Sequence, residues 1–537
     1  MTELMRGGWP RLVVLISLTL FAWTHRDAFW MSGFADDLGV LVDLSKRAGQ
    51  GGLLADVLAH ATQPLWPGST MWRPLPYASF ALDAMLWGAE PGLWRITNLA
   101  LHLACAIVAG MICRDMTQQM RAGAVGFAVF LLIPWSPEVV MWLAGRFDGW
   151  ATLAVLLSVW AALKSEGGDR GWLASVVAGA AAYPSKESAL ILPLWIALIA
   201  VFVSYRDGDN DGASPAPLTR LLTDTIKRHG LLLLSHAALA AAYLLWRATL
   251  FPTSSLSVYN AAPQMNVFEL VLRLGTHLQF PLGLLPLAPI AAGVAIVCYF
   301  SALAIALCSS PRIHRSSVVI GGLFIVTVLA AVATYFVTSP GDGDGYRLYY
   351  LATLGFAVTA ASASVSTTRI APVVIVALLA ALAAWQGQVT DEWRRASLAM
   401  KATELAIRRA ALAMPSKDYG LVLLPDHLGH VPFARNAQGA LPQLAGLSAP
   451  QLDVLAQLIV FTPPQIDEWH RLSQEGVVRK ITTRGDAPSN PTQYFCFDPR
   501  TQTLQAFGFW GSGTLEDWRR KWRESVAAAC APVPVER

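Results

Sequence analysis

The chain has 537 residues, of which 54% are hydrophobic and only 14% are charged. Soluble globular proteins carry about 25% charged residues. This composition, with a mean hydropathy of +0.45, therefore excludes a disordered chain and a large soluble α/β enzyme. The formal net charge of +4 is too small on so long a chain to indicate a nucleic-acid-binding protein. Six cysteines are too few for a disulfide scaffold.

Long apolar runs, separated by short polar segments, extend from residue 10 to residue 388. A helix needs about 17–25 apolar residues to cross the hydrocarbon core. On this basis residues 1–388 are predicted to form an all-α polytopic membrane domain with eleven transmembrane helices, of which the third to the fifth are short. The predicted helices lie near residues 10–24, 91–113, 121–136, 148–163, 171–184, 188–205, 229–250, 287–309, 317–338, 346–366 and 370–387.

The first apolar run follows Arg6 and Arg11, as the apolar part of a signal peptide would. However, Thr24-His25-Arg26-Asp27 comes after it, where a signal peptide would have a small-residue cleavage site. We therefore expect a retained signal-anchor. Lys and Arg are more frequent in the loops that share a side with the N-terminus, which places that side in the cytoplasm. With eleven helices the C-terminal region is then outside, and the Ala-rich composition favours a bacterial inner membrane.

The composition changes after Gln388. Residues 392–414 are predicted to form an amphipathic helix at the membrane surface, within a linker of residues 389–416. Residues 417–537 are expected to form a small periplasmic α/β domain. Its predicted elements are a strand at 419–424, a hairpin from 493–498 and 503–509, and a final helix near 514–528. Cys496 and Cys530 could pair in this compartment, or they could be two unrelated thiols.

Ionisable side chains, which are costly at a bilayer, gather in the outer segments. The cytoplasmic loops have no comparable mixture of acids and bases. Carboxylates supply a general base, and Arg and Lys supply charge-assisted hydrogen bonds to phosphate, so the set suits a phosphorylated lipid whose head lies outside. The segments are Phe34-Ala35-Asp36-Asp37, Trp72-Arg73-Pro74-Leu75, residues 136–148 with Glu138, Arg146 and Asp148, Tyr183-Pro184-Ser185-Lys186-Glu187, and Gly345-Tyr346-Arg347-Leu348-Tyr349-Tyr350.

In this order, the acidic pair, Arg-Pro-Leu, Pro-Glu-x-Val-x-Trp-x-x-Gly-Arg-x-Asp, the Lys-Glu pair and Arg-x-x-Tyr resemble motifs of the integral-membrane GT-C glycosyltransferases. The resemblance is greatest to the protein O-mannosyltransferase branch and its tetratricopeptide-bearing relatives, and it covers roughly residues 10–370. It implies transfer of a sugar from a polyprenyl phosphate, usually with inversion, at the extracytoplasmic face. The chain has a short tail in place of tetratricopeptide repeats, which leaves the acceptor open.

Together with this resemblance, Asp36 is the first choice for the base that deprotonates an acceptor hydroxyl, and Asp37 the second. The alternative is an ordinary loop aspartate that caps a short helix. Two adjacent carboxylates repel, which raises the pKa of one of them. Asp148 or Glu138 is expected to orient the acceptor or an arginine, while Arg146 meets phosphate. The equally weighted alternative is a structural ion pair.

Lys186, which precedes Glu187, and Arg347 are candidates to stabilise the leaving polyprenyl phosphate, or else they anchor lipid head groups. Arg73 has an extended backbone before a proline and either braces the acidic pair or touches substrate. Two further sets are expected to be structural. Asn98 and His102 share a helix face, which favours a helix–helix hydrogen bond, and Glu269, Arg273 and His277 are expected to form a solvated face.

No His/Cys cluster has metal-ligand spacing, and no nucleotide-binding motif is present. No cofactor is expected, although Asp36 and Asp37 could hold a divalent cation with a phosphate. The expected partners are a polyprenyl-phosphate sugar donor, a protein, lipid or glycan acceptor, and membrane lipid. One alternative is a transporter or lipid flippase, but the charges lie near one surface and no internal repeat is found. Another is a catalytically silent relative that assembles envelope components through its tail.

Overall fold

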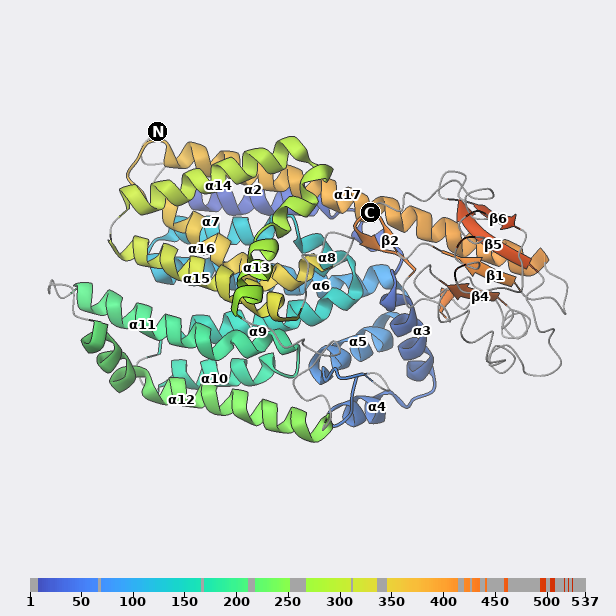
Figure 1. Cartoon of the computed structure of the whole chain (residues 1–537), viewed down its shortest axis with the longest axis horizontal. Helices are drawn as coiled ribbons and strands as arrows, with labels where there is room; N and C mark the ends of the chain where they lie inside the picture. The colour runs from blue at the N-terminus through green and yellow to red at the C-terminus, as the bar shows by residue number, and fades with distance from the viewer. Residues whose placement is uncertain are drawn as a thin grey trace.

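A computed structural model gives the arrangement of the membrane domain and of parts of the C-terminal region (Figure 1). It describes residues 8–65, 69–165, 169–210, 218–251, 267–310, 312–335, 345–413, 420–424, 427–434, 440–441, 458–461, 493–498, 503–507, 516, 520 and 524.

Most of the described chain is a bundle of long helices whose axes run side by side (Figure 1). Seven helical segments of the described residues are long and apolar enough to cross a membrane. They include α2 (Trp9–Thr24), α6 (Pro91–Thr117), α11 (Leu192–Asn210), α12 (Leu218–Leu250), α14 (Pro289–Ser309), α15 (Arg312–Tyr335) and α17 (Ala371–Ala413).

Four shorter apolar helices complete the bundle, and each coincides with a predicted span. They are α7 (Met120–Leu131), α9 (Arg146–Ala162), α10 (Arg170–Ala182) and α16 (Thr353–Ser364). The all-α polytopic architecture is therefore confirmed, whereas eleven crossings stay a prediction because these four helices fall short of a full span.

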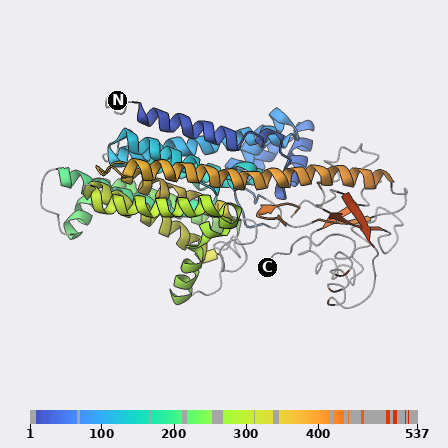
Figure 2. The ribbon, with the colours of Figure 1, turned by 90° about the horizontal axis from the view of Figure 1, so that it is seen from above.

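The last apolar helix differs from the prediction. The sequence predicts that a transmembrane helix ends near residue 388 and that a separate surface helix follows it. Instead α17 continues for 43 residues, and Figure 2 shows it running along the bundle and on past the C-terminal sheet. Its sequence contains no internal proline beyond its first turn, so the backbone has no reason to break where the composition turns polar. The domain boundaries themselves stay predictions.

The predicted outer segments fold into short helices, of which those within residues 36–87 lie at one end of the bundle (Figure 1). Three of them have proline as their first or second residue, at Pro74, Pro137 and Pro281, which fits the first helical turn because an N–H group there would have no helical partner. These elements are η1 (Ala28–Trp30), α3 (Asp36–Gly49), α4 (Leu53–His60), α5 (Pro74–Trp87), α8 (Ser136–Met141), η2 (Leu143–Gly145), η3 (Glu187–Ile191), α13 (Val267–His277), η4 (Phe280–Leu287) and η5 (Tyr346–Ala352).

The described part of the C-terminal region contains a four-stranded sheet of order β4-β1-β5-β6. Strand β1 (Gly420–Leu423) lies parallel to β4 (Leu458–Phe461) and β5 (Gln493–Asp498), and β5 forms an antiparallel pair with β6 (Thr503–Phe507). The predicted strand and hairpin are confirmed. A separate small hairpin pairs β2 (His427–Leu428) with β3 (Val431–Pro432). The side chain of Cys496 and all of Cys530 lie outside the described residues, so their pairing stays open.

Candidate active site

The acidic pair follows a sharp turn at Ala35. Its φ of 46° lies in the left-handed region that favours glycine, and such backbone strain is often found at functional sites. Helix α3 begins immediately afterwards at Asp36, so both carboxylates lie in its first turn, and Lys46 and Arg47 lie in its last. This charge order matches the helix dipole. The strained turn therefore fixes where the two acids project.

Asp37 is fully buried and anchors this turn to a distant segment. Its carboxylate accepts backbone hydrogen bonds from Leu143 at 3.0 Å and Ala144 at 2.9 Å, and from Phe34 at 3.3 Å. Burial raises the pKa of Asp37 to about 7, against the opposing effect of these hydrogen bonds and of Arg95. With its oxygens held by backbone groups and away from solvent, Asp37 fits a structural role better than that of a base.

Asp36 differs from its neighbour in exposure. It is partly exposed where Asp37 is buried, because consecutive residues of an α-helix project about 100° apart. Asp36 is thus the member of the pair that a substrate can reach, carried by a turn that its neighbour holds in place. This geometry favours the order of preference that the sequence predicts, and the roles of the two acids stay predictions.

The segment from α8 through η2 to the start of α9 is held by buried polar groups. The side-chain amide of Asn98 donates to the carbonyl oxygens of Val139 at 3.1 Å and Trp142 at 3.0 Å. Gly145 is required here, since a Cβ at this position would lie within 2.7 Å of the backbone of Val139 and Glu138. The glycine of the predicted motif therefore permits η2 to fold back against α8.

Arg146 is fully buried and faces away from any open surface. Its guanidinium pairs with Asp83 of α5 at 2.5 Å and donates to Asn98 at 2.9 Å and to the carbonyl oxygen of Trp94 at 2.7 Å. Because Arg146 is fully buried and its Nε and one terminal nitrogen bind protein groups, it fits the structural alternative better than contact with phosphate.

Four of the predicted residues form one ion-paired cluster, which we call the charge cluster: Glu138, Asp148, Lys186 and Arg347. The Lys186 ammonium lies 2.5 Å from the Asp148 carboxylate. The Arg347 guanidinium lies 2.6 Å from Glu138 and 3.7 Å from the second oxygen of Asp148. The Arg347 side chain is 18% exposed against 6% for Lys186, so Arg347 is the more accessible of the two cations.

A second set of charges lies next to this cluster through the Lys186–Glu187 peptide. Arg73 donates to Glu187 at 2.9 Å, and Arg247 of α12 lies 3.5 Å from the other carboxylate oxygen. Arg73 also packs over the Phe147 ring, 4.8 Å from its centroid. All three charged side chains are more than nine-tenths buried. The ion pair of Arg73 is therefore with Glu187, and it ties the first outer loop to η3.

The structure brings the acidic turn and the charge cluster to one segment. Asp37 binds the backbone of Leu143 and Ala144. The preceding residue, Trp142, lies under the guanidinium of Arg347, 4.2 Å from its ring centroid. Segments that are far apart in the sequence therefore converge on residues 138–148, as the predicted site requires. Arg146 belongs to the same segment but points into its buried side.

The small β2–β3 hairpin of the C-terminal region contacts the same part of the molecule. The Ala35 N–H donates to the carbonyl oxygen of Phe433 at 2.8 Å. The His430 N–H donates to the Glu392 carboxylate of α17 at 3.1 Å, and its ring lies 6.2 Å from that of Tyr346, next to Arg347. The hairpin thus contacts the acidic turn, α17 and η5 together.

Two other sets of polar residues are structural. His102 bonds to the Tyr350 hydroxyl at 2.6 Å and to the carbonyl oxygen of Leu131 at 3.1 Å, which confirms a helix–helix contact. The expected solvated face of α13 is wrong. Arg273 and His277 are buried, and His277 bonds to the Tyr349 hydroxyl at 2.7 Å. The four-residue spacing does place them on one face, but that face packs inward.

Asp83 and Arg247 are parts of these networks that the sequence analysis missed. Each is a single charge inside an apolar run, and such charges are expected to be paired or functional because they are expensive near a membrane. Among the described residues, no group of three or more His, Cys, Asp and Glu side chains is placed to hold a metal ion.

No family model and no curated protein matches this chain. It is similar to the crystal structure of ArnT from Cupriavidus metallidurans bound to undecaprenyl phosphate, with 14% identity and a TM-score of 0.48 over 92% of this chain and 94% of that chain. The apo-state structure of the same protein gives 12% identity and a TM-score of 0.46 over 92% and 93%.

ArnT is a GT-C glycosyltransferase, the superfamily that the sequence motifs resemble, whereas the likeness to the protein O-mannosyltransferase branch is not confirmed. With TM-scores below 0.5, neither match establishes an activity for this chain. The proposal below therefore depends on the residues of this chain.

Proposed function

We propose that this chain is an inverting glycosyltransferase of the membrane that moves a sugar from a polyprenyl phosphate to an acceptor hydroxyl at the extracytoplasmic face. The acceptor hydroxyl gives its proton to the Asp36 carboxylate as its oxygen bonds to the anomeric carbon. The bond from that carbon to the phosphate oxygen breaks, and polyprenyl phosphate leaves with the electron pair. The reaction needs no oxidant, reductant or further cofactor.

One observation carries this proposal: the turn that presents a partly exposed carboxylate and the charge cluster both contact the segment of residues 138–148. Asp36 projects from a turn that Asp37 ties to Leu143 and Ala144, while Arg347 lies over the neighbouring Trp142. A base and positive charge held beside one substrate would serve both ends of the bond exchange.

The charge cluster is suited to the leaving group. Glu138 and Asp148 hold Arg347, and Asp148 holds Lys186, through ion pairs within the protein. Groups that are already oriented stabilise a developing phosphate anion without further reorganisation. Arg347 is the more accessible cation, and its planar guanidinium can offer two parallel N–H groups to a phosphate. We therefore assign Arg347 to the phosphate and Lys186 to the support of Asp148.

Sugar transfer in isolated membranes tests this assignment. Membranes containing the chain are incubated with a panel of polyprenyl-phosphate ¹⁴C-sugars, and label that leaves the polyprenyl lipid is measured. Asp36→Asn is expected to lower transfer at least about 100-fold, because a positioned base contributes roughly 10²–10⁴-fold. Asp27→Asn is the matched control, since Asp27 is an exposed aspartate of the same outer loop.

Full transfer by the Asp36→Asn variant would contradict the assigned base. Reconstituted vesicles address the transporter alternative separately. If labelled polyprenyl-phosphate sugar crosses the bilayer without covalent change, and no transfer occurs on either side, the chain is a transporter and the proposed function fails.

A further inference from the structure

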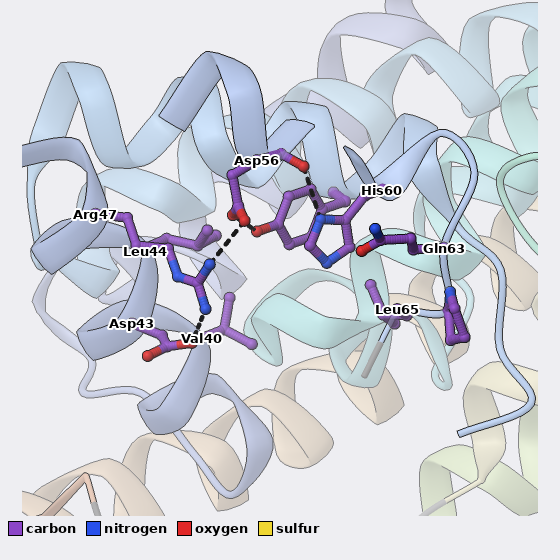
Figure 3. A pocket seen from close by; sticks show the side chains of 10 residues that line it. Val40, Asp43, Leu44, Arg47, Asp56, His60, Gln63 and Leu65 are labelled. Atoms are coloured by element: carbon purple, nitrogen blue, oxygen red, sulfur yellow. Dashed lines mark hydrogen bonds and ion pairs between the residues drawn. The ribbon is translucent and has the colours of Figure 1, made fainter. Parts of the chain in front are cut away.

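A cavity lined by none of the charge-cluster residues lies between the three short helices of the first predicted outer loop. Helices α3, α4 and α5 enclose a volume of about 410 Å³, within the range of roughly 300–1,000 Å³ that is usual for small-molecule sites. Figure 3 shows Asp43 and Arg47 on one side of it and His60 and Gln63 on the other.

The polar groups of this cavity are connected to one another. Arg47 pairs with Asp56 at 2.7 Å and with Asp43 at 3.3 Å. The Tyr77 hydroxyl also donates to Asp56. The His60 ring stacks on the Tyr77 ring, with centroids 3.7 Å apart and planes 14° from parallel. Burial and the contact with Asp56 raise the pKa of Tyr77 well above its usual value, so its hydroxyl stays a donor.

The Asp43–Arg47 pair of this network contributes little to holding the loop together. The Asp43 and Arg47 side chains are 64% and 44% exposed, and exposed ion pairs contribute only about 0–1 kcal/mol to stability. Packing comes instead from apolar residues of the same helices, among them Leu41, Phe80 and Trp94, which are almost fully buried. The open polar groups are therefore available to bind a ligand.

Helix α3 connects this cavity to the acidic pair. Asp36, Val40, Asp43 and Arg47 are spaced by four, three and four residues, which puts them on one stripe of a helix. Val40, Asp43 and Arg47 line the cavity, and Val40 lies only about 6 Å along the axis from Asp36. A ligand in the cavity would therefore lie along the helix face that begins with Asp36.

We propose that the cavity between α3, α4 and α5 is a saccharide subsite that holds the acceptor, which rests on the proposed function. Several hydroxyl groups need donors and acceptors in fixed positions, and Arg47, Asp56 and Gln63 supply both kinds. The flat face of the stacked His60–Tyr77 pair suits the apolar face of a sugar ring. A sugar held here extends the acceptor toward Asp36.

Saturation-transfer NMR on the full-length protein tests the subsite without any donor. The probes are methyl α-glucoside, methyl α-mannoside and methyl N-acetyl-α-glucosaminide, in a detergent that has no sugar head group. At least one probe is expected to receive saturation from the wild-type protein. Gln63→Ala and His60→Ala together are expected to lower that signal at least fivefold. Gln63→Ala alone changes an exposed side chain, so it tests the subsite without risk to the fold.

Lys46→Ala is the matched control, because Lys46 is exposed and lies beside Arg47 but projects about 100° away from it. Its signal is expected to equal that of the wild type. The proposal is overturned if no probe receives saturation, or if the signal is unchanged in the Gln63 and His60 variants.

The Asp36→Asn variant separates this subsite from the proposed function. It is expected to keep the NMR signal while losing sugar transfer. Glycoside binding in a protein that transfers no sugar from any donor would contradict the proposed function and support the subsite. Sugar transfer without glycoside binding would support the proposed function and contradict the subsite.

Discussion

The backbone N–H of Ala35 donates a hydrogen bond of 2.8 Å to the carbonyl oxygen of Phe433. This contact joins the strained turn that presents Asp36 to a hairpin near the other end of the chain. The buried side chain of Phe433 and the contact between His430 and Glu392 hold the hairpin in place. Part of the C-terminal region, the β2–β3 hairpin, thus lies against the candidate site.

Gly429→Ala is predicted to displace the β2–β3 hairpin from the candidate site. Gly429 has a φ of 58°, and a Cβ there would collide with the Glu392 carboxylate that receives the His430 N–H. A hydrogen bond to a charged group contributes roughly 1.5–3 kcal/mol, so loss of the hairpin's position is expected to lower sugar transfer about tenfold. The measurement is transfer of ¹⁴C-sugar per amount of chain in the membrane.

Gly51→Ala is the matched control for this variant. Gly51 also has a positive φ, of 74°, but a Cβ there meets nothing within 4 Å, so it reproduces the backbone strain without the collision. Equal activity of the two variants would show that the hairpin does not position the site.

Asp37 is predicted to make the folded state less stable as the pH rises. Its pKa is raised from 3.8 to about 7 in the folded chain, so between these values the unfolded chain loses a proton that the folded chain keeps. The free energy of unfolding therefore falls from about pH 4 to about pH 7 and then levels. Thermal unfolding of the detergent-solubilised wild type and of Asp37→Asn measures this directly.

The Asn variant removes the titrating group, so the Tm of the wild type minus that of Asp37→Asn is expected to be largest near pH 4.5 and smallest near pH 7.5. A difference that grows with pH would mean that the anchored carboxylate is ionised in the fold throughout, against this account.

Arg146 and Arg347 are predicted to respond differently to the same substitution. Arg146→Lys keeps the charge beside Asp83 but loses the hydrogen bonds to Asn98 and Trp94, which is expected to cost about 3 kcal/mol of stability. Arg347→Lys loses the planar group over Trp142 and is expected to lower transfer about 100-fold with little change in Tm. Tm and transfer rate are measured for both variants.

The opposite pattern would exchange their roles. A stable, inactive Arg146→Lys protein beside an unstable, active Arg347→Lys protein would assign the phosphate to Arg146, as the sequence motif first indicates, and would remove Arg347 from the proposed chemistry.

The sequence predicts the helical bundle well because apolar length is a local property. Each predicted span coincides with a helix, and even the short ones at 121–136 and 171–184 correspond to α7 and α10. The continuity of α17 could not be predicted in this way, because a change in composition alters the surroundings of a helix without breaking its backbone.

The membership of the candidate site is also largely predictable, because charges beside apolar runs are rare and their cost demands a reason. Which of these charges pair with one another cannot be predicted from the sequence. The sequence leaves open whether Arg146 and Asp148 contact substrate or belong to a structural ion pair, and it does not indicate that Arg146 pairs with Asp83 and Asp148 with Lys186. The backbone contact at Ala35 joins the acidic turn to a hairpin that the sequence analysis did not single out, so no local pattern indicates it.

The most direct test of the central claim is mass spectrometry of glycoconjugates from a strain that lacks the chain, complemented with the wild type or with Asp36→Asn. We predict that one glycoconjugate loses a sugar in the deletion strain, regains it with the wild type, and stays unmodified with Asp36→Asn at equal protein level. Full restoration by Asp36→Asn, or identical glycoconjugates with and without the chain, would contradict the account.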